Sequence, residues 1–363
     1  MAKSTEGSTK QLIELCAGYF FFYVLTGVFA KLFTEGGTEA FSLHMNQIDY
    51  MVYNTIGGTM TALGIVFIRR WYKMKSNQMI KFGPFTLPQE INYIIPSGFM
   101  TAIIIPATTL MYTFPGMSVM VAMVIMRSSV IIISRLVDAI QISKGILKKT
   151  IYIEENVAVV FALCAASIKI FWVKEGDFAF LQNTAAVTIL ISYIIAYAIR
   201  IYIMNYFKNT RGKGVPLDNQ GFFGVEQIVA CFFIVVISVL VYVGNSAFGW
   251  TSTQVTQFHQ ALSTFSINWG WAVLSGTAFG IVAFYSVFIF MFKGRTATFS
   301  GLVNRLTSLT AGTIATLLGA IFLGSHYPNL QDWLSLAFIL IAVGFLTVAE
   351  RKRSAELAMK KEL

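Results

Sequence analysis

Residues 117–140 read MSVMVAMVIMRSSVIIISRLVDAI, an apolar run in which Arg127 lies near the middle. Residues 296–323 read TATFSGLVNRLTSLTAGTIATLLGAIFL and carry Arg305 at a comparable depth. Each run is long enough to cross a hydrocarbon core of roughly 30 Å as a helix. A charge at the centre of a bilayer costs about 2.5–3.5 kcal/mol on insertion scales, and no carboxylate lies at the depth of either arginine. A chain that keeps two such charges is expected to use them.

The composition of the whole chain matches these two runs. Of its 363 residues, 56% are hydrophobic and only 12% are charged. Soluble domains contain about 45–50% apolar and about 25% charged residues. The chain is therefore expected to be an all-α polytopic membrane protein, because barrel strands would alternate apolar and polar residues. The apolar runs predict ten spans, at residues 11–33, 49–69, 91–113, 117–140, 156–173, 180–206, 222–244, 269–292, 296–323 and 332–349.

The net charge of +10 follows the predicted topology. Most of the basic residues lie at the two ends of the chain and in every second loop, for example at 69–81, 144–149 and 208–213. The loops on the opposite side contain a single lysine, Lys174. This asymmetry places both termini in the cytoplasm by the positive-inside rule. The positive charge therefore reports topology and does not indicate a nucleic-acid partner.

The spans repeat in two sets of five. Pairing span 1 with span 6, span 2 with span 7 and so on gives starting positions that differ by nearly constant offsets. Because five is odd, the second copy enters the membrane inverted, as in many secondary transporters. The resulting division is a cytoplasmic N-terminus at 1–10, a first repeat at 11–173, an inverted second repeat at 174–349 and a basic cytoplasmic tail at 350–363.

The repeat makes the two arginines equivalent. The hexapeptide around Arg127, VIMRSS, resembles the hexapeptide LVNRLT around Arg305. Counted from the span starts at 1.5 Å per residue, both arginines lie roughly 14–15 Å deep. We therefore expect them in symmetric positions that face each other across a central cavity. The alternative is that each is a structural cation bonded to backbone carbonyls.

Polar residues accompany Arg305 along its helix. Thr298 precedes it by seven residues and Ser308 follows it by three, which places both near its face. Leu309 interrupts this face, so the stripe is mixed. Thr298 and Ser308 are candidate substrate-binding residues, although such hydroxyls also bond to backbone or neighbouring helices.

A second stripe follows Arg127. Ser134 and Asp138 share its helical face, and Ser134 is a further candidate substrate-binding residue. Arg135 and Asp138 are three residues apart, a spacing that allows an ion pair at the inner mouth. Arg200, like Lys31 and Lys169, lies close enough to a span end for its stem to snorkel to the interface.

Prolines and glycines mark candidate gates. Pro96 and Pro106 are expected to kink the third span, and Pro115-Gly116 turn directly into the fourth. The hairpins between spans 3 and 4 and between spans 8 and 9 are therefore candidate gates. The segment 245–268 contains no Lys, Arg, Asp or Glu and is expected to lie along the outer interface.

Several short motifs resemble one family of transporters. They are TTLMY at 108–112, MRSSVII at 126–132, TATFS at 296–300, and the closing LG at 318–319 and VG at 343–344. Together with ten inverted spans they resemble the drug/metabolite transporter superfamily, in its nucleotide-sugar-transporter-like solute carrier branch. The resemblance implies alternating access, a central cavity lined by both halves and gating hairpins, with Arg127 at the site position of the fourth span.

These observations predict a secondary transporter of an organic anion, such as a nucleotide-sugar, a nucleotide or a phosphorylated metabolite. Paired arginines bind phosphate or carboxylate bidentately. No carboxylate lies at mid-depth to carry a proton, which favours exchange or facilitated passage. The alternative within the same family is an exporter of neutral or cationic metabolites or drugs, in which the arginines are structural.

Other classes of protein fit the sequence poorly. With three histidines, dispersed acidic residues and no His-Glu-x-x-His pattern, the chain offers no enzyme-like site, and neither a metal nor a cofactor is expected. Cys16, Cys164 and Cys231 lie in separate apolar runs and are expected to be packing residues. A scaffold protein without transport activity is the remaining alternative.

The expected location is an integral position in a bacterial inner membrane or a eukaryotic endomembrane. The chain ends in Lys360-Lys361-Glu362-Leu363, which matches a di-lysine retrieval signal of the endoplasmic reticulum. A basic tail also produces this pattern by chance, so the pattern does not decide between a bacterial inner membrane and a eukaryotic endomembrane. The partners expected are the lipid bilayer and the small anion, and the sequence leaves monomer and homodimer open.

Overall fold

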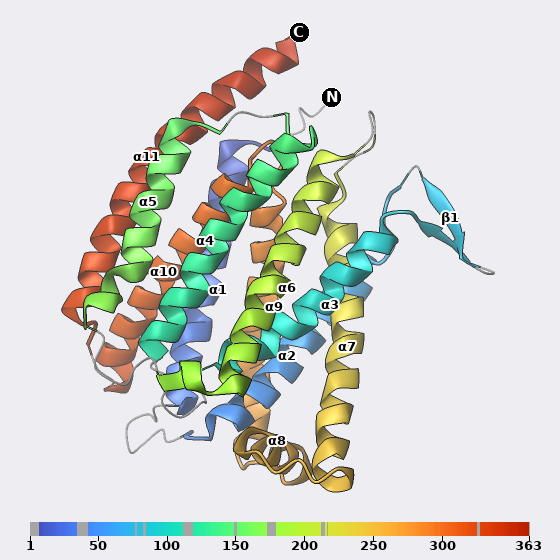
Figure 1. The fold of residues 1–363 in the computed structure, drawn as a ribbon, viewed down its shortest axis with the longest axis vertical. Helices are drawn as coiled ribbons and strands as arrows, with labels where there is room; N and C mark the ends of the chain where they lie inside the picture. The colour runs from blue at the N-terminus through green and yellow to red at the C-terminus, as the bar shows by residue number, and fades with distance from the viewer. Residues whose placement is uncertain are drawn as a thin grey trace.

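The fold is a bundle of long helices (Figure 1). The computed structural model describes residues 7–34, 43–76, 78–82, 85–111, 119–148, 151–172, 179–211, 215, 217–324 and 327–362. The long helices are α1 (Thr9–Thr34), α2 (Gln47–Ile68), α3 (Ile91–Leu110), α4 (Val119–Ser143), α5 (Ile153–Ser167), α6 (Thr184–Asn209), α7 (Asn219–Ala247), α9 (Trp269–Phe290), α10 (Ala297–Leu323) and α11 (Leu330–Glu362). The predicted turn at Pro115-Gly116 lies outside the described residues, as do Tyr112 and Lys174.

Each predicted span corresponds to one of these helices. Within the described residues, nine helices are long and apolar enough to cross a membrane. The remaining long helix, α4, is 25 residues long and carries Arg127, Arg135 and Asp138. The chain is therefore an all-α polytopic membrane protein. The start of α1 and the end of α11 lie at the same end of the bundle in Figure 1.

Side chains that cap the helix ends explain where several helices begin. The first N–H groups of a helix have no partner in their own helix, so a polar side chain just before it accepts a hydrogen bond from them. The Oδ1 of Asn46 accepts from the N–H of Ile48 at 2.9 Å, and the Oγ1 of Thr296 accepts from that of Phe299 at 3.1 Å. At the other end, α10 ends at Gly324, whose φ of 68° suits glycine.

Helices α2 and α9 approach each other so closely that their backbones touch. A Cβ on Gly57 of α2 would stand 1.8 Å from the carbonyl oxygen of Val273, and one on Gly276 of α9 would stand 2.2 Å from that of Asn54. Gly58 and Gly280 extend the contact along both helices. Small residues at an interface let membrane helices pack by van der Waals contact, and here only glycine fits.

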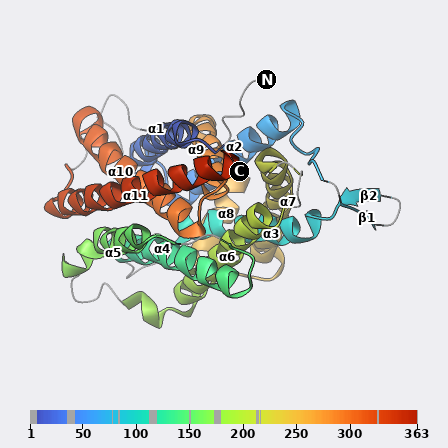
Figure 2. The ribbon, with the colours of Figure 1, turned by 90° about the horizontal axis from the view of Figure 1, so that it is seen from above.

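The other helices pack in a regular set of pairs around this contact. Helix α1 packs against α9 and α10, while α6 packs against α3 and α4. Helix α3 also packs against α7, and α5 packs against α11. Viewed along the bundle in Figure 2, α4 and α5 lie on the side opposite α1.

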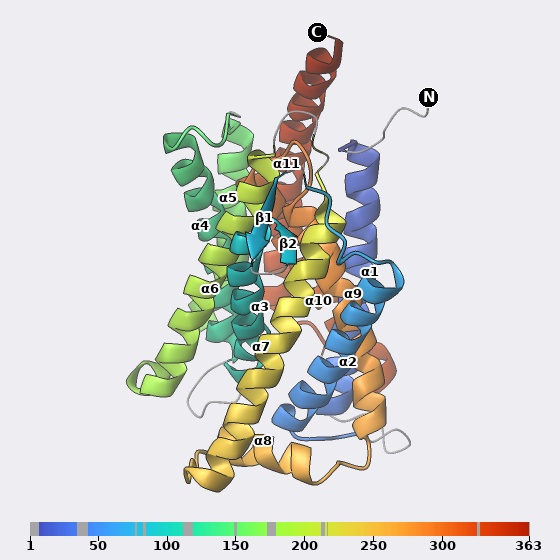
Figure 3. The same cartoon turned by 90° about the vertical axis from the view of Figure 1, so that its right-hand side faces the viewer.

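Three features were not predicted from the sequence. Segment 245–268 contains a short helix, α8 (Thr253–Ser263), which lies across the end of the bundle opposite the termini (Figure 3). Strands β1 (Met79–Phe82) and β2 (Phe85–Pro88) form an antiparallel hairpin outside the bundle. Helix α11 continues from the last span to Glu362, so residues 350–362 of the predicted tail are helical. The 3-10 segments Ile168–Trp172 and Ala179–Gln182 complete the fold.

The backbone contact between α2 and α9 predicts a position-dependent effect of adding a side chain to α2. We expect Gly57→Leu to separate the helices, which destabilises by at least about 1–3 kcal/mol. Its matched control is Gly64→Leu on the same helix, because a Cβ at Gly64 meets nothing within 4 Å. The measurement is the melting temperature of the purified protein in detergent. Equal melting temperatures for the two variants would contradict the contact.

Candidate functional site

Arg305 lies in a group of tyrosines contributed by α1 and α6. Its side chain is buried on α10, with 8% of the residue exposed. The guanidinium carbon lies 5.1 Å from the ring centroid of Tyr197, within range for a cation–π interaction. Tyr19 and Tyr193 also interact electrostatically with this charge. Three aromatic rings with polar edges thus surround a cation inside the membrane.

The polar groups around Arg305 are only partly satisfied. Its Nε is buried and has no hydrogen-bond partner among the described residues. The neighbouring Asn304 is well held: its Nδ2 donates to the Oγ of Ser286 at 3.0 Å, and its Oδ1 accepts from the hydroxyl of Tyr19 at 3.5 Å. A buried donor without a partner costs about 1–3 kcal/mol, so Arg305 has capacity to bind an acceptor.

Arg127 lies on α4 and extends toward α10. A Cβ at Gly312 would stand 3.7 Å from its Nη2, so the absence of a side chain there leaves room for the guanidinium. Arg127 is half-buried and makes no hydrogen bond or ion pair within the described residues. Gly312 is seven residues beyond Arg305, roughly 10 Å along the helix axis. The guanidinium of Arg127 thus lies beside α10, about two turns along that helix from Arg305.

The predicted ion pair between Arg135 and Asp138 does not form, because each side chain has another partner. Both carboxylate oxygens of Asp138 accept backbone hydrogen bonds at the start of α10, from the N–H of Ala297 at 2.8 Å and of Thr298 at 2.6 Å. A helix N-terminus favours negative charge, which explains why Asp138 is fully buried there. Arg135 instead donates from Nε to the Oδ1 of Asn156 on α5 at 3.0 Å.

The three hydroxyl residues predicted to line the site, Ser134 on α4 and Thr298 and Ser308 on α10, are buried. Ser134 donates to the carbonyl of Val130 at 2.8 Å, and Ser308 donates to that of Arg305 at 2.9 Å. Ser134 also packs against the backbone of Gly301. The Oγ1 of Thr298 has no partner among the described residues. Ser134 and Ser308 therefore bond to their own helices, which is the structural alternative that the sequence left open.

A buried ion pair that the sequence analysis missed joins α6 and α7. Arg200 donates from Nε and Nη2 to the two carboxylate oxygens of Glu226, at 2.9 and 2.8 Å. The hydroxyl of Ser97 on α3 donates to the same carboxylate at 2.6 Å. Arg200 does not snorkel to the interface as predicted, because Glu226 neutralises it at its own depth. The sequence did contain a signal for this pair, because Arg200 and Glu226 lie at similar depths in consecutive predicted spans.

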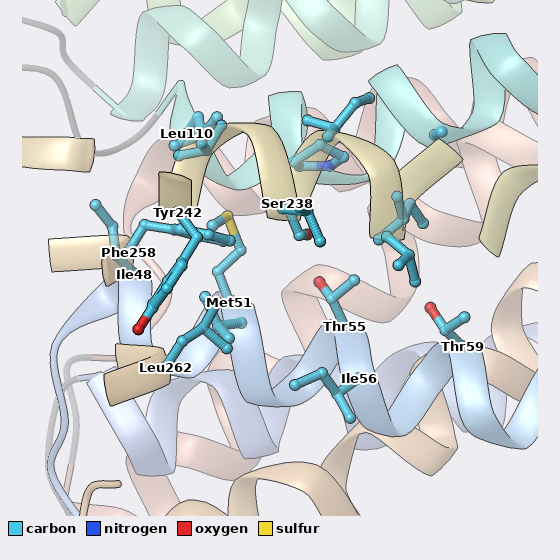
Figure 4. Close-up of a pocket in the computed structure, with 18 of the residues that line it drawn as sticks. Ile48, Met51, Thr55, Ile56, Thr59, Leu110, Ser238, Tyr242, Phe258 and Leu262 are labelled. Atoms are coloured by element: carbon cyan, nitrogen blue, oxygen red, sulfur yellow. The ribbon is translucent and has the colours of Figure 1, made fainter. Parts of the chain in front are cut away.

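A separate cavity of about 830 Å³ lies between α2, α3, α7 and α8 (Figure 4). Its lining is almost entirely aliphatic and aromatic, and two residues of α6, Ala185 and Ile189, complete it. Neither Arg127 nor Arg305 lines it. The structure therefore contains two distinct environments, the cationic and aromatic group around Arg305 and this apolar cavity.

The residues described hold no cluster of three or more His, Cys, Asp or Glu side chains that could bind a metal. The buried acidic residues of the bundle are instead engaged with arginines or backbone N–H groups, as Glu226 and Asp138 illustrate. What the site around Arg305 can do chemically is bind and orient an electron-rich group.

Comparisons with known proteins support the fold. No family model and no curated protein matches the sequence. Sixteen chains of solved structures match. One of them, described only as "Crystal structure of protein", has a TM-score of 0.57 and 14% identity, over 95% of this chain and 99% of its own. At this identity the similarity shows the fold alone.

The Arg200–Glu226 pair predicts a large effect when one partner is removed. Glu226→Gln leaves a buried guanidinium without its anion and is expected to lower the free energy of unfolding by about 3–5 kcal/mol. The double variant Arg200→Met with Glu226→Leu is expected to recover most of this loss. The measurement is unfolding by SDS titration in mixed micelles.

Glu154→Gln is the control for this series. It removes the partner of Lys352, whose side chain is 49% exposed, and is expected to cost less than about 1 kcal/mol. A double variant as unstable as Glu226→Gln would contradict the view that the loss comes from a buried guanidinium left without its anion.

Proposed function

We propose that the protein is a secondary transporter that moves an organic anion by alternating access, through exchange or facilitated passage. The substrate class is a nucleotide-sugar, a nucleotide or a phosphorylated metabolite. Two features of the structure support this proposal. The chain forms a polytopic helical bundle, and the bundle contains cationic side chains that no carboxylate neutralises.

The packing of the helices supports two inverted five-helix repeats, α1–α5 and α6, α7, α9–α11. In this repeat α1 corresponds to α6, α2 to α7, α3 to α9, α4 to α10 and α5 to α11. The contact between α2 and α9 in the structure therefore has a counterpart between α7 and α3. Likewise, the α1–α9 contact corresponds to α6–α3, and the α1–α10 contact corresponds to α6–α4. The α4–α10 and α5–α11 contacts convert into themselves. All of these pairs are in contact, as a duplicated and inverted unit requires.

The single observation that carries the proposal is the contrast between Arg305 and the other buried arginines. In the part of the chain that the structure describes, Arg200, Arg295 and Arg353 are buried and each pairs with a glutamate. Arg305 is equally buried and has an aromatic ring in place of a carboxylate. Buried charges are normally paired with an opposite charge, so we assign Arg305 to binding the anionic substrate.

The buried carboxylates support exchange or facilitated passage over proton coupling. Glu226 is held by Arg200 and Ser97, and Asp138 by two backbone N–H groups. Glu155 accepts from Thr296 at 2.7 Å and pairs with Arg353. Each of these carboxylates is fixed in place by its hydrogen-bond donors, an arrangement that suits a structural role better than the carriage of a proton across the membrane.

A second candidate is transport of neutral or cationic compounds, with the arginines structural. It is favoured by the apolar cavity, which has no charged lining residue and does not include Arg127 or Arg305. The two candidates differ in a simple measurement, since only the first predicts that anions raise the melting temperature of the purified protein.

The proposal is tested by measuring the exchange of radiolabelled anions across the membrane of liposomes that contain the purified protein. We expect Arg127→Met and Arg305→Met each to lower exchange of radiolabelled nucleotides, nucleotide-sugars or sugar phosphates by about ten- to a hundredfold, the value of one charge-assisted hydrogen bond. Arg305→Lys is expected to retain part of the activity, because it keeps the charge and loses the bidentate geometry.

The control is Arg69→Met, which removes an exposed arginine at the end of α2. Transport is compared only between variants whose melting temperature equals that of the wild type, so that a lower transport rate does not result from unfolding. Transport of every anion at the wild-type rate by both methionine variants would refute the assignment of the site.

A further inference from the structure

The turn that ends α2 has a backbone conformation that arginine disfavours. The N–H of Trp71 donates to the carbonyl of Val66 at 2.9 Å, and that of Arg70 donates to the carbonyl of Phe67 at 3.2 Å. These two bonds form a Schellman motif, whose left-handed position is normally a glycine. Arg70 occupies this position with a φ of 56°, and every other positive φ in the part of the chain that the structure describes belongs to a glycine. Such strain is typical of positions kept for function.

The segment after Arg70 is fixed against the bundle at two points. The ring of Trp71 stacks on that of Phe284, with the centroids 5.5 Å apart. A Cβ on Gly224 of α7 would stand 2.5 Å from the carbonyl oxygen of Trp71, so the two backbones are in contact. Further along, the N–H of Lys75 donates to the Oδ2 of Asp218 at 2.8 Å. The turn between these anchor points therefore has a defined position.

The other side chains of this turn are exposed, and two of them carry unneutralised charge. They are Arg70, Tyr72 and Lys73, and we call them the basic turn. Within the described residues, neither Arg70 nor Lys73 forms a hydrogen bond or an ion pair through its side chain. The Nζ of Lys73 lies 6.0 Å from the ring centroid of Tyr72. By contrast, the nearby Arg211 is paired with Glu90.

The side chains that precede the basic turn are apolar and also exposed. Ile68 is 83% exposed and Phe67 is 56% exposed, at the end of a helix that is long and apolar enough to span a membrane. The ring of Phe67 lies 5.9 Å from that of Tyr72, and tyrosine is enriched where hydrocarbon meets headgroups. Figures 2 and 3 show the end of α2 at the periphery of the bundle, where lipid can reach it. The order is that of a phospholipid, with acyl chains followed by a charged headgroup.

We propose that the basic turn binds an anionic phospholipid in the leaflet at this end of the bundle, with Arg70 and Lys73 donating to its phosphate oxygens. A guanidinium presents a fork of N–H donors that fits two phosphate oxygens, and an ammonium adds a point charge. The acyl chains lie against Phe67 and Ile68. A headgroup with net negative charge is favoured, because the choline of a zwitterionic lipid would add a third cation. This site is independent of Arg305 and of any transport activity.

Native mass spectrometry of bound lipids tests the site. The full chain is purified in micelles that contain equal amounts of phosphatidylglycerol and phosphatidylcholine, and the lipids that stay bound are identified by mass. We expect the wild type to retain mainly phosphatidylglycerol. Arg70→Gly is expected to lower the affinity for this lipid about fivefold, the value of one basic side chain at an anionic membrane surface. Arg70→Lys keeps the charge and is expected to retain most of the affinity.

The glycine variant separates lipid binding from folding. Because a φ of 56° suits glycine, Arg70→Gly is expected to melt at or above the wild-type temperature in the absence of lipid while it binds phosphatidylglycerol less tightly. Lys73→Met leaves the Schellman motif intact and is expected to lower the affinity by a similar factor. The matched control is Arg351→Met, which removes an exposed arginine of α11 and is expected to bind like the wild type. Equal affinities of Arg70→Gly and the control would overturn the proposal.

A second measurement distinguishes a lipid from a free phosphate compound. Glycerol phosphate carries the phosphate group without acyl chains. We expect an excess of it to leave phosphatidylglycerol bound to the wild type, because it makes no contact with Phe67 or Ile68. Displacement of the lipid by glycerol phosphate would refute the assignment of the site to a lipid.

Discussion

Hydrocarbon offers no hydrogen-bond partner, so each polar group inside this bundle must find one within the protein. The start of α10 shows how strictly this holds. The side chain of Thr296 takes one of its N–H groups, and the carboxylate of Asp138, from another helix, takes two more. This interaction ties α4 to α10 at a defined height. The positions of Ser134 against Gly301 and of Arg127 near Gly312 follow from the same antiparallel alignment.

Hydropathy and charge were sufficient to predict the helices, because a membrane span is determined by local composition. The predicted spans match the long helices of the structure. The partners of the charges could not be predicted in the same way. Arg135 has Asp138 three residues away, yet it bonds to Asn156, since the stronger competitor for Asp138 is the N-terminus of a helix far away in the sequence. Local spacing says nothing about such competition.

The candidate site could also be predicted only in part from the sequence. The depth of Arg305 could be counted along its run, but its tyrosine neighbours come from α1 and α6 and require the packing to be known. Helix α8 escaped prediction because it is short and weakly apolar, so it resembles a loop in the sequence. The apolar cavity could not be predicted either, since its walls are mostly ordinary apolar residues of five different helices. Helix α6 connects the two environments: Ile189 lines the cavity, and Tyr197, two turns on, contacts Arg305.

The glycine contact between α2 and α9 also limits how the molecule can move. Backbones in direct contact cannot slide past each other without a collision between atoms that have no freedom to rotate away. Helices α2 and α9 therefore form one rigid body, and α3 and α7 form another, because a Cβ on Gly98 would stand 2.9 Å from the carbonyl oxygen of Glu226. The apolar cavity between α2, α3, α7 and α8 lies along the seam between these two bodies. A rocking motion of one rigid body against the other would open and close that seam and would change the volume of the cavity.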